Sequence, residues 1–298
     1  MDIRLDWLGV ATFRLTIGDF VVFLDGYLDR VSAASPVGLS TADVERADVV
    51  LVGHSHFDHL WGVERIAAQT GATVIGSHET VRVLTEEGVP RDRLVAVAGG
   101  EPIRLADHVV ARVYPSLHSC VWASGLGSVA ADTECLGDVG LTQDERDRRL
   151  ATTFRPPDDG SGADEALAHM MGATRTFSDG GALAFLIETP SGGILWKDTS
   201  GHWSGVLARL QPDLALLAAA ARPNVDGEPH QGSLAGFIAS EVAMTGARQV
   251  ALCHHDDWLP PFTGPLDAEP VRRRLSRDAP SAELLDLGFL EGRRVLSG

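Results

Sequence analysis

The chain has 298 residues, of which 44% are hydrophobic, and its formal net charge is −16 at pH 7. This length and composition allow a sizeable buried core in one large or two small domains. The acidic balance argues against a nucleic-acid partner, because phosphate binding needs clustered lysine and arginine.

Targeting signals are not evident in the sequence. No run of about 18 apolar residues could span a membrane, and the N-terminus has no cationic region followed by an apolar stretch, so no secretory signal is expected. The three cysteines include no Cys-x-x-Cys pair and cannot form a disulfide framework. These features favour a cytoplasmic protein in a reducing compartment.

The first part of the chain alternates strand-like and helical patterns. Residues 2–25 resemble a strand meander with a turn at Gly18-Asp19, and residues 47–52 form an apolar run typical of a buried strand. Helices are expected at 60–70 and 78–87, where Gly71 and Gly88 are placed as C-terminal stops. Shorter strands are expected at 72–76 and within 94–113.

Residues 119–180 interrupt this pattern, since they are rich in Ser, Gly, Asp and Pro, with polar helical pieces around 142–151 and 163–171. Strands return at 182–188, 193–197, 213–217 and 249–253, and helices are expected at 204–210 and 233–245. Strands followed by helices, twice over, indicate two βα halves packed face to face. We therefore expect one domain over residues 1–298, with an insertion at about 119–180.

The most informative motif is His54-Ser55-His56-Phe57-Asp58-His59, directly after the apolar run. Imidazole nitrogen and carboxylate oxygen are ligands that divalent metals such as zinc prefer. His54 and His56, two residues apart, can point at one metal, whereas Asp58 and His59 would face a second. A loop of solvated histidines is the alternative, but the clustering of ligands at a strand end favours metal binding.

This His-x-His-x-Asp-His motif after a hydrophobic strand resembles the metallo-β-lactamase superfamily of binuclear metallohydrolases. Further ligand types follow apolar runs as that family requires: His118 after 109–114, Asp198 after 193–197 and His254 after 249–253. The openings at 5–15 and 23–26 resemble the family's first strands. Lys197 departs from the pattern, because many members carry glycine before the aspartate. The resemblance implies an α/β fold, a four-layer αββα sandwich with mixed sheets.

The resemblance also implies a metal assignment. The first metal would take His54, His56 and His118, the second would take Asp58, His59 and His254, and Asp198 would bridge them. Two divalent ions are expected, with zinc first and manganese or iron as alternatives. A metal-bridging hydroxide would be the nucleophile, because a bound metal lowers the pKa of water to near 7.

Other residues are candidates for roles around the metals. Asp58 and His202 are expected to be catalytic, although His202 could instead pack beside Trp203. Asp25 is expected to hold a ligand histidine. Asp256 or Asp257 could orient an imidazole or could equally be a solvated loop acid. Whether His169, His230 or His255 contacts substrate is left open, while His78 and His108 are expected to be surface or structural residues. A partly apolar pocket is expected from aromatic residues in loops: Tyr27, Trp122, Trp203, Trp258 and Phe262.

The resemblance is closest to the sugar-phosphate lactonase-like subgroup, which implies hydrolysis of a small ester, lactone or similar carbonyl substrate. A phosphodiesterase using the same site is the first alternative. An iron redox protein is disfavoured, because such relatives usually replace the second histidine by glutamate and this chain has His56. A non-catalytic metal-binding protein would be expected to lack a ligand. The expected partner is a small molecule, without nucleic acid or membrane, and a homo-oligomer is left open.

Overall fold

The computed structural model describes residues 2–123, 130–153, 163–176, 178–220 and 222–296. Two mixed seven-stranded sheets form its centre. The first sheet has the order β19 (Arg293–Arg294), β1 (Ile3–Trp7), β2 (Phe13–Ile17), β3 (Phe20–Leu24), β4 (Val49–Leu51), β5 (Thr73–Gly76) and β6 (Leu94–Ala96). Strands β1 to β3 pair antiparallel, and β3 to β6 pair parallel.

The second sheet repeats this division between antiparallel and parallel pairing. Its order is β18 (Glu283–Leu285), β17 (Gln249–Cys253), β13 (Leu214–Ala218), β11 (Gly192–Lys197), β10 (Leu183–Thr189), β8 (Val109–Pro115) and β7 (Pro102–Ala106). The strands β7, β8, β10 and β11 pair antiparallel, and β11, β13, β17 and β18 pair parallel. Small sheets join β12 (Gly201–His202), β14 (Asn224–Val225) and β15 (Glu228–Pro229), and β9 (Glu134–Leu136) with β16 (Gln231–Ser233).

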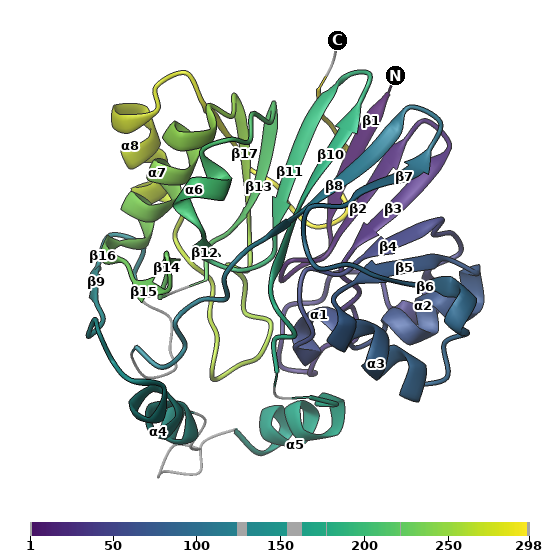
Figure 1. Ribbon diagram of the computed structural model, residues 1–298, viewed down its shortest axis with the longest axis horizontal. Coiled ribbons are helices and arrows are strands. Elements are labelled where there is room, and N and C mark those ends of the chain that lie inside the picture. The colour runs from purple at the N-terminus through teal and green to yellow at the C-terminus, as the bar shows by residue number, and fades with distance from the viewer. Residues whose placement is uncertain (1, 124–129, 154–162, 177, 221, 297–298) are drawn as a thin grey trace.

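Helices cover the outer face of each sheet, which gives the expected αββα layers (Figure 1). On one side lie α1 (Phe57–Leu60), α2 (Val63–Thr70) and α3 (His78–Glu86), and on the other α6 (Ser204–Leu207), α7 (Leu234–Thr245) and α8 (Glu269–Asp278). Below both sheets in this view lie α4 (Gln143–Thr153) and α5 (Ala163–Ala173). Short 3-10 turns occur at Thr41–Asp43 and Arg91–Arg93.

The hydrophobic core has three main parts. Side chains from the facing surfaces of both sheets, such as Phe13, Phe185 and Trp196, pack into one central cluster. A second cluster lies between the first sheet and α2 and α3, and a third between the second sheet and α7 and α8. Because the parallel strands are covered on both faces, they consist of continuous apolar runs rather than alternating ones.

Most of the expected helices are present, with two differences in their limits. The helix expected at 60–70 begins only at Val63 as α2, because Gly62 before it has a φ of 112°, and the separate short helix α1 precedes it. The helix expected at 204–210 ends at Leu207. The expected glycine stop at Gly71 is confirmed, since it adopts a left-handed conformation at the end of α2.

The segment 119–180 is less separate from the core than its polar composition suggests. Helix α4 is polar, as expected, but Ala163, Ala166 and Ala173 of α5 are almost fully buried. Ala131 belongs to the cluster beneath α7. The segment therefore contributes to the buried interior, because small alanine side chains allow close packing even in a polar stretch.

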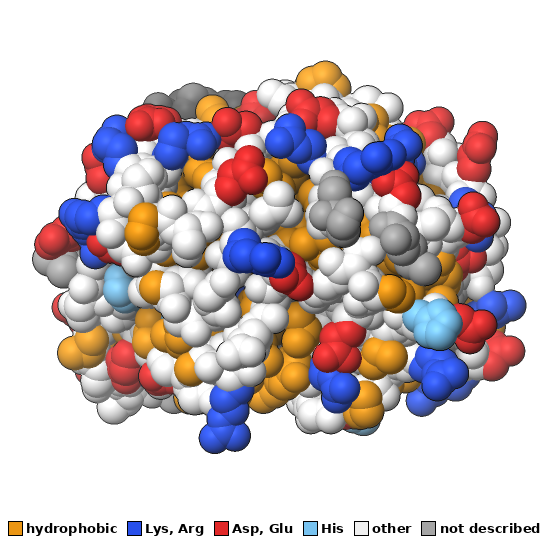
Figure 2. All heavy atoms as spheres, turned by 90° about the horizontal axis from the view of Figure 1, so that it is seen from above, with side chains coloured by type: hydrophobic (Ala, Val, Ile, Leu, Met, Phe, Trp, Pro, Cys, Tyr) orange, Lys and Arg blue, Asp and Glu red, His pale blue; other side chains and the backbone are white. Residues whose placement is uncertain are grey.

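The surface is charged and mixed. On the face that carries the chain ends, acidic and basic side chains are interspersed (Figure 2). Across the described residues, no helix combines the length and apolar character needed to cross a membrane.

Candidate metal centre

The candidate ligands all follow the carboxyl ends of strands. His54 to His59 follow β4, His118 follows β8, Asp198 follows β11 and His254 follows β17. These strand ends come from both sheets and meet at one edge. The structure brings all seven expected ligand residues together there, in three overlapping groups found among the described residues.

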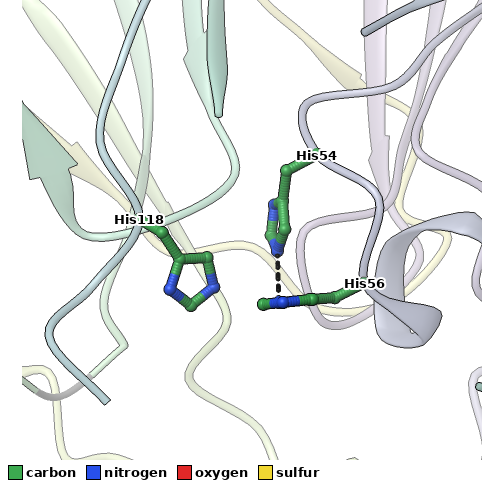
Figure 3. A group of neighbouring side chains, drawn as sticks. All are labelled: His54, His56 and His118. Atoms are coloured by element: carbon green, nitrogen blue, oxygen red, sulfur yellow. Dashed lines mark hydrogen bonds between the residues drawn. The ribbon is translucent and has the colours of Figure 1, made fainter. Parts of the chain in front are cut away.

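The first group contains His54, His56 and His118. In Figure 3, His54 and His56 project from the loop after β4 towards His118, which comes from the loop after β8. His54 Nε2 lies 3.1 Å from His56 Nδ1. His118 Nδ1 lies 2.9 Å from the carbonyl oxygen of Ser119, to which it can donate, so that Nε2 is left as the lone-pair atom for a metal.

The second group contains Asp58, His59 and His254. One carboxylate oxygen of Asp58 lies 3.3 Å from Nε2 of each histidine. His59 Nδ1 lies 2.6 Å from Asp25, whose other oxygen accepts the Gly53 N–H at 3.0 Å. Asp25 therefore holds a candidate ligand histidine through the ring nitrogen that faces away from Asp58, as expected.

Asp198 lies between the two groups and forms a third set with His54 and His59. Its Oδ2 lies 2.6 Å from His54 Nδ1 and 3.5 Å from His59 Nδ1. Its Oδ1 is buried and has no hydrogen-bond partner among the residues described. A Cβ atom on Gly53 would lie only 2.1 Å from the Asp198 carboxylate, so only glycine allows this approach. That Asp198 bridges two metals stays a prediction. It requires the unpaired Oδ1 atom to be available as a ligand atom.

This set of side chains fits a divalent cation. Asp198 Oδ1 is an unpaired buried carboxylate oxygen, and such an atom is costly unless a cation or donor approaches it. Six further imidazole and carboxylate groups surround the same region. Imidazole with carboxylate is the donor set that zinc, manganese and iron accept.

Burial and neighbouring charges shift the pKa values of the first-group histidines and of His59 in opposite directions. Burial lowers the pKa values of His54, His56 and His118, so these imidazoles are neutral at pH 7. Burial also opposes charge on His59, but Asp58 and Asp25 on either side hold its pKa well above the usual range.

The carboxylates respond to the same two effects. Burial would raise the pKa of Asp58, but His59 and His254 more than offset it and hold that pKa well below the usual range. Burial raises the pKa of Asp25 to about 7, although His59 opposes the rise. Burial also raises the pKa of Asp198.

These pKa shifts predict different pH dependences for the two groups. A metal entering the second group must displace a proton from His59, so its affinity should rise about tenfold per pH unit across neutral pH. The first group is already neutral, so its affinity should stay nearly constant over the same range. Competition titrations of metal-free protein with Zn²⁺ at several pH values measure both slopes, and equal slopes would contradict this division.

His202, an expected catalytic residue, belongs to a different polar cluster. Its Nδ1 lies 2.7 Å from Glu241 of α7, and its ring stacks on Phe237 with centroids 5.3 Å apart. Lys197 also contacts Glu241, and all three side chains of this ionisable cluster are buried. The structure does not bring His202 into the three ligand groups. Its catalytic role stays a prediction without support from this geometry.

The residues that follow His254 make contacts away from the ligand groups. Asp256 does not contact an imidazole in the contacts described; its carboxylate accepts the Val10 N–H at 3.1 Å and pairs with Arg30. Asp257 accepts from the Ser35 hydroxyl at 2.8 Å. His255 stacks on Trp7, with centroids 4.4 Å apart, and lies outside the described ligand groups.

An aromatic cluster lies beside the second group. Trp258 meets His254 edge to face, with centroids 5.4 Å apart, and Tyr27 packs between Trp258 and Phe57. Helix α5 packs against this cluster through His169. The His169 ring stacks on Trp61, and its Nε2 atom lies 2.8 Å from the Tyr27 hydroxyl oxygen. Of the aromatic residues expected around a pocket, this cluster contains Tyr27, Trp258 and Phe262.

The remaining expected pocket residues lie elsewhere. Trp122 faces the Arg146 guanidinium, 4.7 Å from its ring, and Trp203 is 40% exposed. His230 meets Phe237 edge to face near the His202 cluster. His78 and His108 are exposed, as expected.

Comparison with known proteins identifies the family of this chain. The family model of the beta-lactamase superfamily domain matches residues 22–183, more than half of the chain. The chain therefore belongs to the metallo-β-lactamase superfamily, which is the family expected from its ligand motif.

Individual proteins show how far the similarity extends. A UPF0173 metal-dependent hydrolase of Pyrobaculum islandicum is 32% identical over 148 residues, which cover 48% of this chain and 64% of the relative. The match thus spans less than two thirds of that relative. Igni18, a metallo hydrolase of Ignicoccus hospitalis, shares the fold with a TM-score of 0.62 at 14% identity, covering 99% and 98% of the two chains.

The same fold also occurs in an enzyme of another kind. CmlA, a diiron β-hydroxylase of Streptomyces venezuelae, has a TM-score of 0.54 at 14% identity, covering 96% of this chain and 53% of that one. The fold alone therefore does not determine the reaction, which has to be argued from the side chains of the site.

Proposed function

We propose that this protein is a metal-dependent hydrolase with two divalent ions, zinc being the expected metal. The observation that supports this most directly is the pair of ligand groups joined through His54, His59 and Asp198. The first ion would be held by His54, His56 and His118, and the second by Asp58, His59 and His254. When bound, such ions supply hydroxide at neutral pH and polarise an electrophilic oxygen.

The chain's own residues prepare the site for that chemistry. Asp25 and the Ser119 carbonyl fix the Nδ1 atoms of His59 and His118, so that Nε2 of each faces the centre. Asp58 carries a negative charge at neutral pH, because its pKa is held low by His59 and His254. This charge balances a bound cation, which is the role we propose for Asp58 in catalysis.

We propose a small ester or lactone as the substrate, ahead of a phosphodiester. The aromatic cluster beside His254 supports an uncharged, partly apolar substrate. The net charge of −16 disfavours an anionic phosphodiester through long-range repulsion.

The test is elemental analysis of protein purified without chelator, followed by a hydrolysis screen over lactones, esters, thioesters, phosphodiesters and β-lactams. We expect about two transition-metal ions per chain, and turnover of a lactone or ester that stops on chelation and returns with Zn²⁺. Activity in metal-free protein would overturn the proposal. Turnover of phosphodiesters alone would favour the alternative substrate, and oxygen consumption by an iron-loaded protein would favour redox chemistry.

A further inference from the structure

The backbone at His254 has an unusual conformation. Its φ is 59°, in the left-handed region that residues other than glycine rarely adopt. Its N–H donates to the carbonyl oxygen of Val10 at 2.6 Å, and Val10 itself has a φ of 47°. A left-handed valine is especially unfavourable because its side chain is β-branched. Two residues with unfavourable backbone conformations, in loops that follow strands of different sheets, are therefore hydrogen-bonded to each other, and one of them is a candidate ligand.

Val10 is fixed from its other side by Asp256. The Asp256 carboxylate accepts the Val10 N–H at 3.1 and 3.3 Å and pairs with Arg30 at 2.8 Å. The side chains of Arg30 and Asp256 are only 5% and 6% exposed. A buried carboxylate is stable when it is paired and hydrogen-bonded, and this one has both an ionic partner and a backbone donor.

The Arg30 side chain can reach Asp256 only because residue 9, next to Val10, is glycine. A Cβ atom on Gly9, whose φ is 85°, would lie 1.3 Å from the Arg30 guanidinium. The Trp7 ring nitrogen donates to the same Val10 carbonyl at 3.1 Å. The loop between β1 and β2 is thus shaped to receive Arg30 and to point the Val10 carbonyl at His254.

We infer that Asp256 and Arg30 are positioning residues that fix the backbone of His254 through Val10, and so direct its imidazole at the second metal. We call Arg30, Asp256 and Val10 the His254 brace. This inference rests on the two-metal centre proposed above. The brace joins the loops after β1 and β3 to the loop after β17, and its described hydrogen bonds lead to His254 rather than to His54, His56 or His118.

Removal of the His254 brace should therefore lower the affinity for the second metal only. We expect Asp256→Ala to weaken the second of two Co²⁺ binding steps by roughly 10- to 100-fold, as when other supports of metal ligands are removed, and to leave the first step unchanged. Asp256→Asn keeps an acceptor for the Val10 N–H and should lose less. The readout is the visible absorption of bound Co²⁺ during titration of metal-free protein, which does not depend on turnover.

The matched controls are Asp257→Ala and Asp257→Asn, because the next carboxylate in the chain also bonds across to the first half, through Ser35. Both controls should keep both binding steps. An unchanged second step in Asp256→Ala, or equal weakening of both steps, would overturn the brace. If Asp256→Ala does not fold, Asp256→Asn decides: a second step as tight as in Asp257→Asn overturns the inference, and a weaker one supports it. A wild-type chain that binds one ion overturns the proposed two-metal function, and the brace with it, before any variant is compared.

Discussion

Asp58→Ala and His254→Ala are each expected to lower kcat on the true substrate by on the order of 1000-fold, since a catalytic metal contributes several kcal/mol of transition-state stabilisation. Each change removes one member of the group Asp58, His59 and His254. Metal content should fall from about two ions to about one, because the group around His56 and His118 is untouched. Elemental analysis and steady-state kinetics on the same preparations measure both effects.

The interpretation of these variants requires that they fold. Circular dichroism should show a near wild-type fold, and Asp58→Asn supplies a variant of unchanged size if Asp58→Ala is unstable. His78→Ala is the control, because His78 is exposed at the start of α3 and should alter neither metal content nor rate. A folded Asp58→Ala or His254→Ala protein with the wild-type rate would show that the second group is not needed for turnover.

Replacement of residues 140–175 by a short Gly/Ser linker should change KM or substrate preference by on the order of tenfold, with metal content near normal. The replaced segment contains α5, which covers the aromatic cluster through His169 and is tied to Ser32 by Glu165 at 2.8 Å. None of the seven candidate ligands lies in it. We therefore propose that α5 acts as a cover that shapes the substrate side of the metal centre.

Replacement of α4 alone is the matched control for the cover. Helix α4 contacts a different region, since its Arg146 pairs with Glu228 of β15 at 3.0 Å. Removal of α4 should therefore affect kinetics less than removal of both helices. His169→Ala tests the same contact with a single substitution. Unchanged kinetics in both the 140–175 replacement and His169→Ala would show that α5 is not a cover.

The candidate ligands could be predicted because their signals are local. Each follows an apolar run that forms a strand, and parallel strands deliver the residues after their carboxyl ends to one edge of a sheet. The motif from His54 to His59 contains four of them within six residues. Recognition of the strand ends and of the motif did not require knowledge of which distant segments pack together. The resemblance to a known family supplied the assignment of the ligands to two metals.

The residues that support these ligands could not be predicted because they meet only in the folded chain. Arg30 and Asp256 are 226 positions apart, and no pattern in either segment indicates the other. The sequence predicts a role for His202 at the candidate site because this residue follows Asp198 closely in the chain. Strand β12 instead pairs with β14, and its histidine meets Glu241 on the side of α7. The contacts of His202 in the structure are therefore with residues that are distant in sequence.

The division of the ligands between the halves has a consequence for biosynthesis. A ribosome has added every member of the group His54, His56 and His118 when residue 118 is in place, whereas the other group waits for His254. Segments nearer the N-terminus emerge and begin to fold first. The proposed second ion can therefore be bound only after His254 has been added, which is 136 residues later than His118. Binding of the proposed second ion therefore has to follow the synthesis of strands from both sheets.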